Sequence, residues 1–128
     1  MLDTTNKYGG DWMELVEVCK KTDGLFFPQR EFVLVEGKDI ICSLMAMEIT
    51  TESRLDLTVV TNPKYQRKGY ATTGLKLLIK WAIKNDYKKV TLTNLFGSQA
   101  IDKIAKNLHF TEENQGAWSK SIIGPLNM

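Results

Sequence analysis

The chain has few of the residues that metal centres, disulfide frameworks and secreted proteins need. Its 128 residues include one histidine and two cysteines, and Cys19 and Cys42 do not have the spacing of metal ligands. Residues 1–5 lack the basic and apolar regions of a secretory signal. We therefore expect no metal site, and a cytoplasmic protein in which both thiols are reduced and buried.

Long apolar runs and an excess of one charge are also missing. No run reaches the ~20 apolar residues that cross a bilayer, so no membrane partner is expected. The 17 basic and 15 acidic residues leave a formal net charge of +2. A nucleic-acid-binding domain built on Arg67, Lys68 and the lysines of residues 76–89 would carry a larger positive excess, so that reading is disfavoured.

The composition that remains is that of a globular protein. Hydrophobic residues make up 43% of the chain and charged residues 25%, and no repeat, low-complexity tract or linker divides it. The length suits one hydrophobic core. We therefore expect a single domain over residues 1–128, present as a monomer or a homodimer.

Hydrophobic spacing and turn residues predict an alternating order of helices and strands. Trp12, Leu15, Val16 and Cys19 recur at helical spacing, which predicts a helix over residues 11–21. Strands are predicted at residues 32–36, 40–49, 55–60 and 89–95, helices at residues 72–85 and after the N-cap Ser98, and a last hairpin around residues 113–116. This order predicts a mixed α/β (α+β) fold, with a mostly antiparallel sheet flanked by helices.

The most informative segment lies between the third predicted strand and the helix that follows. Here Gln66-Arg67-Lys68-Gly69-Tyr70-Ala71 forms the turn from strand to helix. Such a turn directs backbone N–H groups and the positive end of a helix dipole towards one point, which suits a phosphate group. Gly69 has no Cβ, so a phosphate can approach the backbone closely.

This segment and its setting resemble the GCN5-related N-acetyltransferase (GNAT) superfamily, from about residue 32 to residue 123. The family turn reads Arg/Gln-x-x-Gly-x-Gly/Ala, which matches Gln66, Gly69 and Ala71. The resemblance implies acetyl-CoA as cofactor and an amine as acceptor. It also implies a set of cofactor-binding residues: Val59, Val60, Thr61, Gln66, Arg67, Lys68, Gly69, Tyr70, Ala71, Thr72, Asn94 and Ser98.

The second family segment departs from the pattern at three positions. Ser98 stands where Asn is usual, and His109 stands where a helix-ending Gly is usual. Ala105 replaces a Tyr that, where present, protonates the leaving CoA thiolate. The short stretch before Phe32 also implies an N-terminal region that is reduced relative to the strand and two helices common in the family.

Amide formation from a thioester needs a neutral amine, so a base must remove a proton from the alkylammonium form. Asp56, on the predicted third strand, is the first candidate for that base, and Glu48, late in the preceding strand, is the second. Either carboxylate could instead bind a cationic acceptor. His109, the one histidine, is expected to cap a helix C-terminus.

Two functions remain open from the sequence. The first is an acetyl-CoA-dependent N-acetyltransferase that acts by direct attack of a primary amine from a small molecule, peptide or protein. The second is a catalytically weak or inactive acyl-CoA-binding module, which Ala105, Ser98 and the short N-terminal region favour. The sequence does not name the acceptor amine.

Overall fold

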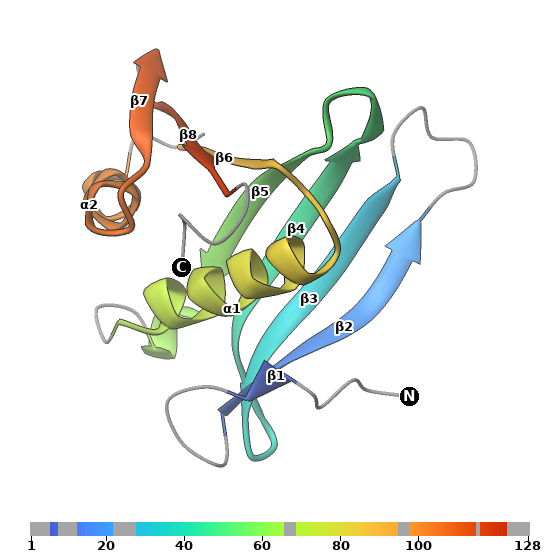
Figure 1. The fold of residues 1–128 in the computed structure, drawn as a ribbon. Coiled ribbons are helices and arrows are strands. Elements are labelled where there is room, and N and C mark those ends of the chain that lie inside the picture. Colours follow the sequence, from blue (N-terminus) through green and yellow to red (C-terminus); the bar gives the residue numbers. More distant parts are fainter. Residues whose placement is uncertain are drawn as a thin grey trace.

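The computed structural model describes residues 6–7, 13–21, 28–65, 69–94, 98–114 and 116–122. These residues form an eight-stranded sheet with two α-helices (Figure 1). The strand order across the sheet is β1-β2-β3-β4-β5-β6-β8-β7. The elements along the chain are β1 (Asn6–Lys7), β2 (Met13–Lys21), β3 (Gln29–Glu36), β4 (Asp39–Ile49), β5 (Arg54–Thr61), α1 (Tyr70–Lys84), β6 (Lys89–Thr93), α2 (Gln99–Asn107), β7 (Thr111–Asn114) and β8 (Ala117–Ser121).

Strands β3, β4 and β5 form the antiparallel meander that the sequence predicts. The turn between β3 and β4 contains Gly37, whose φ of 61° is readily adopted only by glycine. Along β4, Leu44 and Ala46 are buried while Ser43 and Met45 are exposed. That alternation places one face of the meander on the core and leaves the other face open.

The helix predicted over residues 11–21 is wrong, because the described part of this segment is strand β2. β2 pairs antiparallel with β3, and Leu15 lies opposite Leu34. Leu15 and Val16 are adjacent and both buried, and only Leu15 belongs to the main core cluster. The register also shifts between Glu17 and Cys19. Because β2 buries residues on both of its faces and contains a bulge, the spacing of its apolar residues resembles that of a helix.

The only parallel pair among the described strands is β5 with β6. The pairing of β5 with β6 runs from Arg54 opposite Lys89 to Leu57 opposite Leu92. β5 continues to Thr61 beside β4, whereas β6 ends at Thr93 beside β8. The two strands therefore separate after Leu57, and the end of β5 continues beside β4 beyond its pairing with β6.

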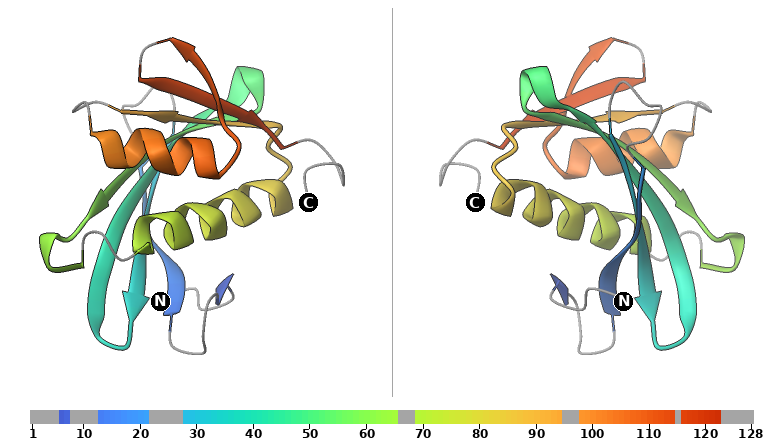
Figure 2. Two further views of the ribbon diagram at one scale, coloured as in Figure 1. Left: turned by 90° about the vertical axis from the view of Figure 1, so that its left-hand side faces the viewer. Right: turned by 90° about the vertical axis from the view of Figure 1, so that its right-hand side faces the viewer.

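Both helices pack on the same face of the sheet (Figure 2). α1 crosses the meander so closely that a Cβ on Gly74 would lie 3.3 Å from a methyl group of Leu44. On the same face, register places Leu92 between Leu57 and Trp118. α2 packs near this end, where Ala105 and Trp118 belong to the core cluster.

The helix boundaries follow local signals. Ser98 is the N-cap of α2, and its hydroxyl accepts a hydrogen bond from the Ile101 N–H, as predicted. His109 follows the helix with a φ of 65°, and its N–H donates to the Lys106 carbonyl, which fits the expected capping position. No helix in the described ranges is long and apolar enough to cross a membrane.

Candidate functional site

A cavity of about 790 Å³ lies where the end of β5 faces the N-termini of α1 and α2. Strand β5 and the segment after it contribute Val59, Val60, Thr61 and Tyr65 to its lining, and the start of α1 contributes Gly69, Tyr70, Ala71 and Thr72. The lining from the start of α2 onwards is Ser98, Gln99, Ala100, Ile101, Lys103, Ile104 and Asn107. Its size falls within the ~300–1,000 Å³ that is usual for small-molecule sites.

The separation of β5 from β6 explains why this cavity exists. Where two neighbouring strands separate, their edges can present backbone N–H and C=O groups to a ligand. Val60 lies on this stretch and exposes 57% of its surface, which is unusual for a β-branched residue within a sheet. The end of β5 therefore offers both backbone hydrogen bonds and an apolar contact.

Gly69 lines the cavity at the N-terminus of α1. It is the N-cap residue, with φ 79° and ψ 5°, and among the described residues no side chain caps the helix there. A Cβ on Gly69 would have no atom of the described residues within 4 Å, so none of these residues fills the space beside its backbone. The first N–H groups of α1 and its positive dipole end therefore face a region suited to an anion.

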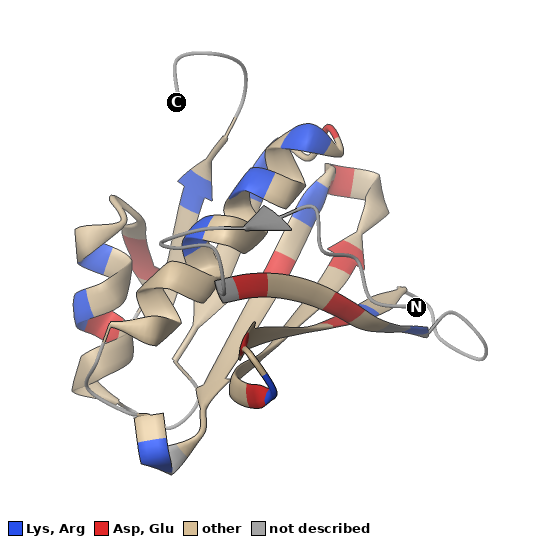
Figure 3. Cartoon of the chain, turned by 90° about the horizontal axis from the view of Figure 1, so that it is seen from below, with Lys and Arg blue, Asp and Glu red and all other residues tan. Residues whose placement is uncertain are grey.

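The wall formed by α2 is a helical stripe. Ala100, Lys103, Ile104 and Asn107 recur at the spacing of one helix face, and all four line the cavity. Lys103 is exposed and brings an ammonium group to the side facing α1. Figure 3 shows basic positions on both helices, an acidic position on α2, and positions of both signs on the strands.

Two tyrosines lie beside the start of α1. The rings of Tyr65 and Tyr70 meet edge to face, with 5.9 Å between their centroids. The Lys64 ammonium lies 5.5 Å from the Tyr65 ring centroid. A hydrogen bond to Asp39, followed by partial desolvation, raises the pKa of Tyr65 above its ordinary value of 10.0. Tyr65 therefore stays protonated at neutral pH.

The structure brings together most of the cofactor-binding residues that the resemblance implies. Those that line the cavity are Val59, Val60, Thr61, Gly69, Tyr70, Ala71, Thr72 and Ser98. Gln66, Arg67 and Lys68 lie outside the described residues. The α2 stripe with Lys103 and Asn107 was missed, because exposed polar residues on a helix resemble a solvated face. The spacing of Ala100, Lys103, Ile104 and Asn107 was the available signal.

Asn94 does not line the cavity but sits behind its α2 wall. Its side-chain N–H groups donate to the Ser98 carbonyl at 2.6 Å and to the Asp102 carboxylate at 3.1 Å. Its side-chain oxygen accepts from the Ser98 N–H at 2.9 Å. The amide hydrogen-bonds with the protein through all of these groups, so the structure gives Asn94 a role in holding α2.

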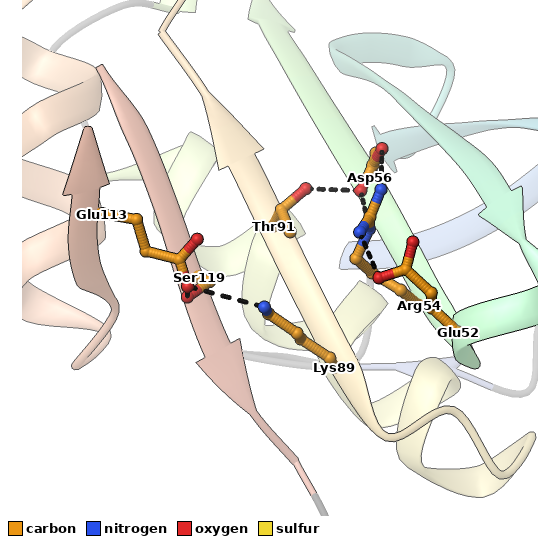
Figure 4. A network of polar contacts seen from close by, with 7 residues as sticks. All are labelled: Glu52, Arg54, Asp56, Lys89, Thr91, Glu113 and Ser119. Atoms are coloured by element: carbon orange, nitrogen blue, oxygen red, sulfur yellow. Dashed lines mark hydrogen bonds and ion pairs between the residues drawn. The ribbon is translucent and has the colours of Figure 1, made fainter. Parts of the chain in front are cut away.

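The carboxylate of Asp56 lies close to the point where β5 and β6 separate, in a polar network on the face away from the helices (Figure 4). Arg54 donates to it from Nε at 2.8 Å and from a terminal nitrogen at 3.4 Å. The Thr91 hydroxyl donates at 2.7 Å. Arg54 also pairs with Glu52 at 2.8 Å. Asp56 is therefore oriented and partly exposed, and it does not line the cavity.

Next to this network, Glu113 of β7 joins β8 to β6. It accepts a hydrogen bond from the Ser119 hydroxyl at 2.5 Å and lies 3.5 Å from the Lys89 ammonium (Figure 4). The Ser119 hydrogen bond, followed by the Lys89 charge, lowers the pKa of Glu113 below its ordinary value of 4.5. These contacts fasten the last hairpin to the centre of the sheet.

Glu48 occupies a different environment, under the last turn of α1. It is buried, its carboxylate accepts a hydrogen bond from the Tyr87 hydroxyl, and Arg30 Nε lies 3.3 Å away. Burial, followed by the contact with Glu48, raises the pKa of Tyr87. Leu55, the β5 partner of Glu48, is four residues from Val59, or about 13 Å along an extended strand. This placement favours a structural role for Glu48.

Two further positions bear on the chemistry. Ala105 is fully buried and does not line the cavity, so that position supplies no proton donor. The Cys42 thiol is buried as expected and lies 3.6 Å from the Thr61 hydroxyl, and burial raises its pKa. Across the described residues, no group of three or more His, Cys, Asp or Glu side chains could hold a metal ion.

Comparison with solved structures identifies the fold. The spermidine/spermine N-acetyltransferase SpeG from Vibrio cholerae, in mutant forms, matches with a TM-score of 0.65 at 17% identity, over 73% of this chain and 64% of that one. The ribosomal-protein-S5-alanine acetyltransferase from Vibrio fischeri matches with a TM-score of 0.65 at 19% identity, over 73% and 61%. The ribosomal L7/L12 α-N-protein acetyltransferase RimL matches with a TM-score of 0.66 at 14% identity, over 73% and 61%.

These matches cover less than two thirds of each of those three proteins, and at such identities they establish the fold alone. No curated protein sequence matches the chain. A model of the acetyltransferase (GNAT) family matches residues 5–110, which is most of the sequence and includes the turn at Gly69. The chain therefore belongs to the GNAT acetyltransferase family.

Proposed function

We propose that the protein transfers the acetyl group of acetyl-CoA to a primary amine by direct attack of that amine on the thioester. The observation that carries this proposal is the cavity in which the end of β5, beyond its pairing with β6, faces the N-terminus of α1. A strand edge and a helix N-terminus in one cavity fit the two chemically different parts of CoA, its amide-containing arm and its phosphates.

The residues present suit that cofactor. The phosphates would bind the N–H groups at Gly69, Tyr70 and Ala71, where no side chain in the described part of the chain caps the helix or fills the space. Lys103, on the opposite wall, would add a positive charge. The amides of the pantetheine arm would pair with Val59 and Thr61, as an added strand pairs with a sheet edge.

Bound acetyl-CoA supplies an activated carbonyl, so that attack by the amine forms a C–N bond, breaks the C–S bond and leaves a thiolate that takes up a proton. A backbone N–H near Val59 and Val60 would stabilise the negative charge that develops on the carbonyl oxygen. Asp56, near the separation of β5 and β6, would attract the ammonium form of the acceptor and accept its proton through water.

The protonation of the thiolate needs no side chain from this protein. Ala105 has no proton to give, and it is buried away from the cavity. A thiol has a pKa of about 8.5, so water can protonate the thiolate near neutral pH. We therefore propose solvent as the source of that proton.

The acceptor is proposed only as a class, a primary amine of a small molecule, peptide or protein. The similar structures include proteins named for spermidine and spermine, and others named for ribosomal proteins. Asp56, one residue before Leu57 where the strands separate, would suit a cationic acceptor. We further propose a single domain, a monomer or homodimer, and a cytoplasmic location.

A second candidate is an acyl-CoA-binding module that has lost transfer. The observations that favour it are the buried Ala105 and the engagement of Asp56 by Arg54 and Thr91. Such a module would use the same cavity, so binding of CoA alone does not separate the two functions.

Turnover separates them. The protein is incubated with acetyl-CoA and a panel of polyamines, amino acids and peptides with free N-termini, and release of free CoA thiol is followed. Thiol release that depends on one acceptor class, with the matching acetylated amine found by mass spectrometry, supports the transferase. Thermal stabilisation by CoA without turnover on any acceptor favours the module, and failure of CoA to bind contradicts both.

A further inference from the structure

Helix α2 is one wall of the cavity, yet it is held to the rest of the protein by few apolar contacts. Of its nine residues, only Ala105 is buried. Ile101 and Ile104 are partly buried, and both also line the cavity. Apolar packing therefore fixes the position of this wall less firmly than it fixes α1. Helix α1 buries seven residues: Gly74, Leu75, Leu77, Leu78, Ile79, Trp81 and Ala82.

Polar contacts compensate on the side of α2 that faces away from the cavity. The Asp102 carboxylate accepts a hydrogen bond from Trp118 Nε1 at 2.9 Å and another from the Asn94 side chain at 3.1 Å. Asn94 also exchanges two hydrogen bonds with the backbone of Ser98. These contacts join the first turn of α2 to the end of β6 and to β8.

The two anchors of this network are themselves rigid. Trp118 is 4% exposed and lies opposite Leu92 in the sheet, within the core cluster. The backbone N–H of Asn94 donates to the Gly116 carbonyl at 2.8 Å, where the hairpin comes so close that a Cβ on Gly116 would lie 3.3 Å from the Asn94 carbonyl oxygen. Movement of α2 away from β5 would break hydrogen bonds to both anchors.

We propose that Asn94, Asp102 and Trp118 are positioning residues, which set the width of the cavity by holding α2 in place. None of the three lines the cavity, and the inference rests on the proposed function of that cavity as the acetyl-CoA site. The Asn94 side chain acts through Ser98 and Asp102, so it supports the cofactor site without contacting the cofactor. The three residues therefore control cofactor affinity and leave the chemical step unaffected.

The state of Asp102 is consistent with a permanent tether. The hydrogen bond from Asn94, followed by that from Trp118, lowers the pKa of Asp102 below its ordinary value of 3.8. A lowered pKa in the folded protein means that the contribution to stability is present above the unfolded value of about 3.9 and is lost as the pH falls further. The tether is therefore intact across the neutral range.

The test compares Trp118→Phe, Asp102→Ala and Asp102→Asn with the wild-type protein. Trp118→Phe keeps an aromatic ring in the core and removes the Nε1 donor together with part of the indole volume, so its free energy of unfolding is measured as well. Dissociation constants for CoA are measured by titration calorimetry, and KM for acetyl-CoA and kcat are measured at saturating acceptor. Lys106→Ala, an exposed residue of α2 that does not line the cavity, is the matched control.

We expect Trp118→Phe and Asp102→Ala to raise the dissociation constant and KM about tenfold, the worth of one hydrogen bond to a charged group, with kcat within about twofold of wild type. Asp102→Asn keeps an acceptor oxygen and should recover most of the affinity. Wild-type affinity in folded Trp118→Phe would overturn the tether, as would a fall in kcat without a change in KM. Failure of the wild-type protein to bind CoA would instead overturn the proposed function.

Discussion

Arg54 holds the carboxylate of Asp56 two residues along the same strand, with 2.8 Å between Nε and Oδ1. Thr91, on the parallel neighbour β6, donates to the same oxygen. The carboxylate is thus fixed where the two strands begin to separate, and among the described residues its other oxygen has one longer contact, with Arg54 at 3.4 Å. This arrangement leaves one carboxylate oxygen available to an acceptor or to water.

Replacement of Asp56 by Asn tests its part in proton removal. Asn keeps an oxygen for Thr91 and Arg54 but removes the negative charge, so folding should change by less than about 1 kcal/mol. We expect kcat/KM for the acceptor to fall about 100-fold, with a changed pH–rate profile, since general base catalysis is worth about 10²–10⁴-fold. An unchanged profile and rate would exclude Asp56 as the base.

Replacement of Glu48 by Gln should affect stability rather than catalysis. The carboxylate is buried between Arg30 and Tyr87, so loss of its charge removes one of the two carboxylates that pair with Arg30, leaving Glu17 as the other. We expect a loss of about 2 kcal/mol in the free energy of unfolding, measured by urea denaturation. The kcat of the folded fraction should match that of wild type. A variant that is as stable as wild type but has a slower chemical step would contradict the structural role and indicate that Glu48 acts in catalysis.

Two substitutions at Gly69 distinguish the cost of backbone strain from the exclusion of the cofactor phosphates. The Gly69 φ of 79° disfavours any other residue, so Gly69→Ala should cost about 1 kcal/mol of stability, yet none of the described residues fills the space beside it and CoA binding should persist. Gly69→Glu adds a negative charge at the same point. We expect its dissociation constant for CoA, measured by calorimetry, to rise at least about 100-fold. Equal affinity in the two variants would place the phosphates elsewhere.

Lys103 should contribute through its charge. We expect Lys103→Ala to weaken CoA binding about fivefold at low salt, because one exposed ion pair is worth up to about 1 kcal/mol. The difference should shrink in 1 M salt, where the screening length falls to about 3 Å. Pantetheine, which lacks the phosphates, should bind wild type and variant alike. A salt-independent loss would mean that Lys103 acts by packing.

Local signals in the sequence were enough for the parts of the fold that local chemistry decides. Pro63 limits the third strand of the meander, Gly69 permits a positive φ before α1, and Ser98 caps α2. Each of these roles depends on neighbours a few residues away, so it can be predicted from spacing alone. The mixed sheet and the family turn followed from the same signals.

The parts that the sequence did not reveal depend on contacts between distant segments. β2 was mistaken for a helix because its strand character comes from pairing with β3, and its apolar residues lie on both faces. Asp102 looked like an ordinary helix-surface acid, although Trp118 approaches it from 16 residues away. The role of Asn94 was also not predicted, because its hydrogen bonds with Ser98 and Asp102 become apparent only when α2 is placed beside β6.

A crystal structure of the chain grown with saturating CoA tests the central claim most directly. We predict that the pyrophosphate accepts hydrogen bonds from the backbone N–H groups of residues 69–71. The pantetheine arm should lie beside the end of β5, between Val59 and Thr61. Thiol and acyl ends should point towards the separation of β5 and β6. CoA bound at another surface, with the cavity between β5 and α2 empty, would contradict the account.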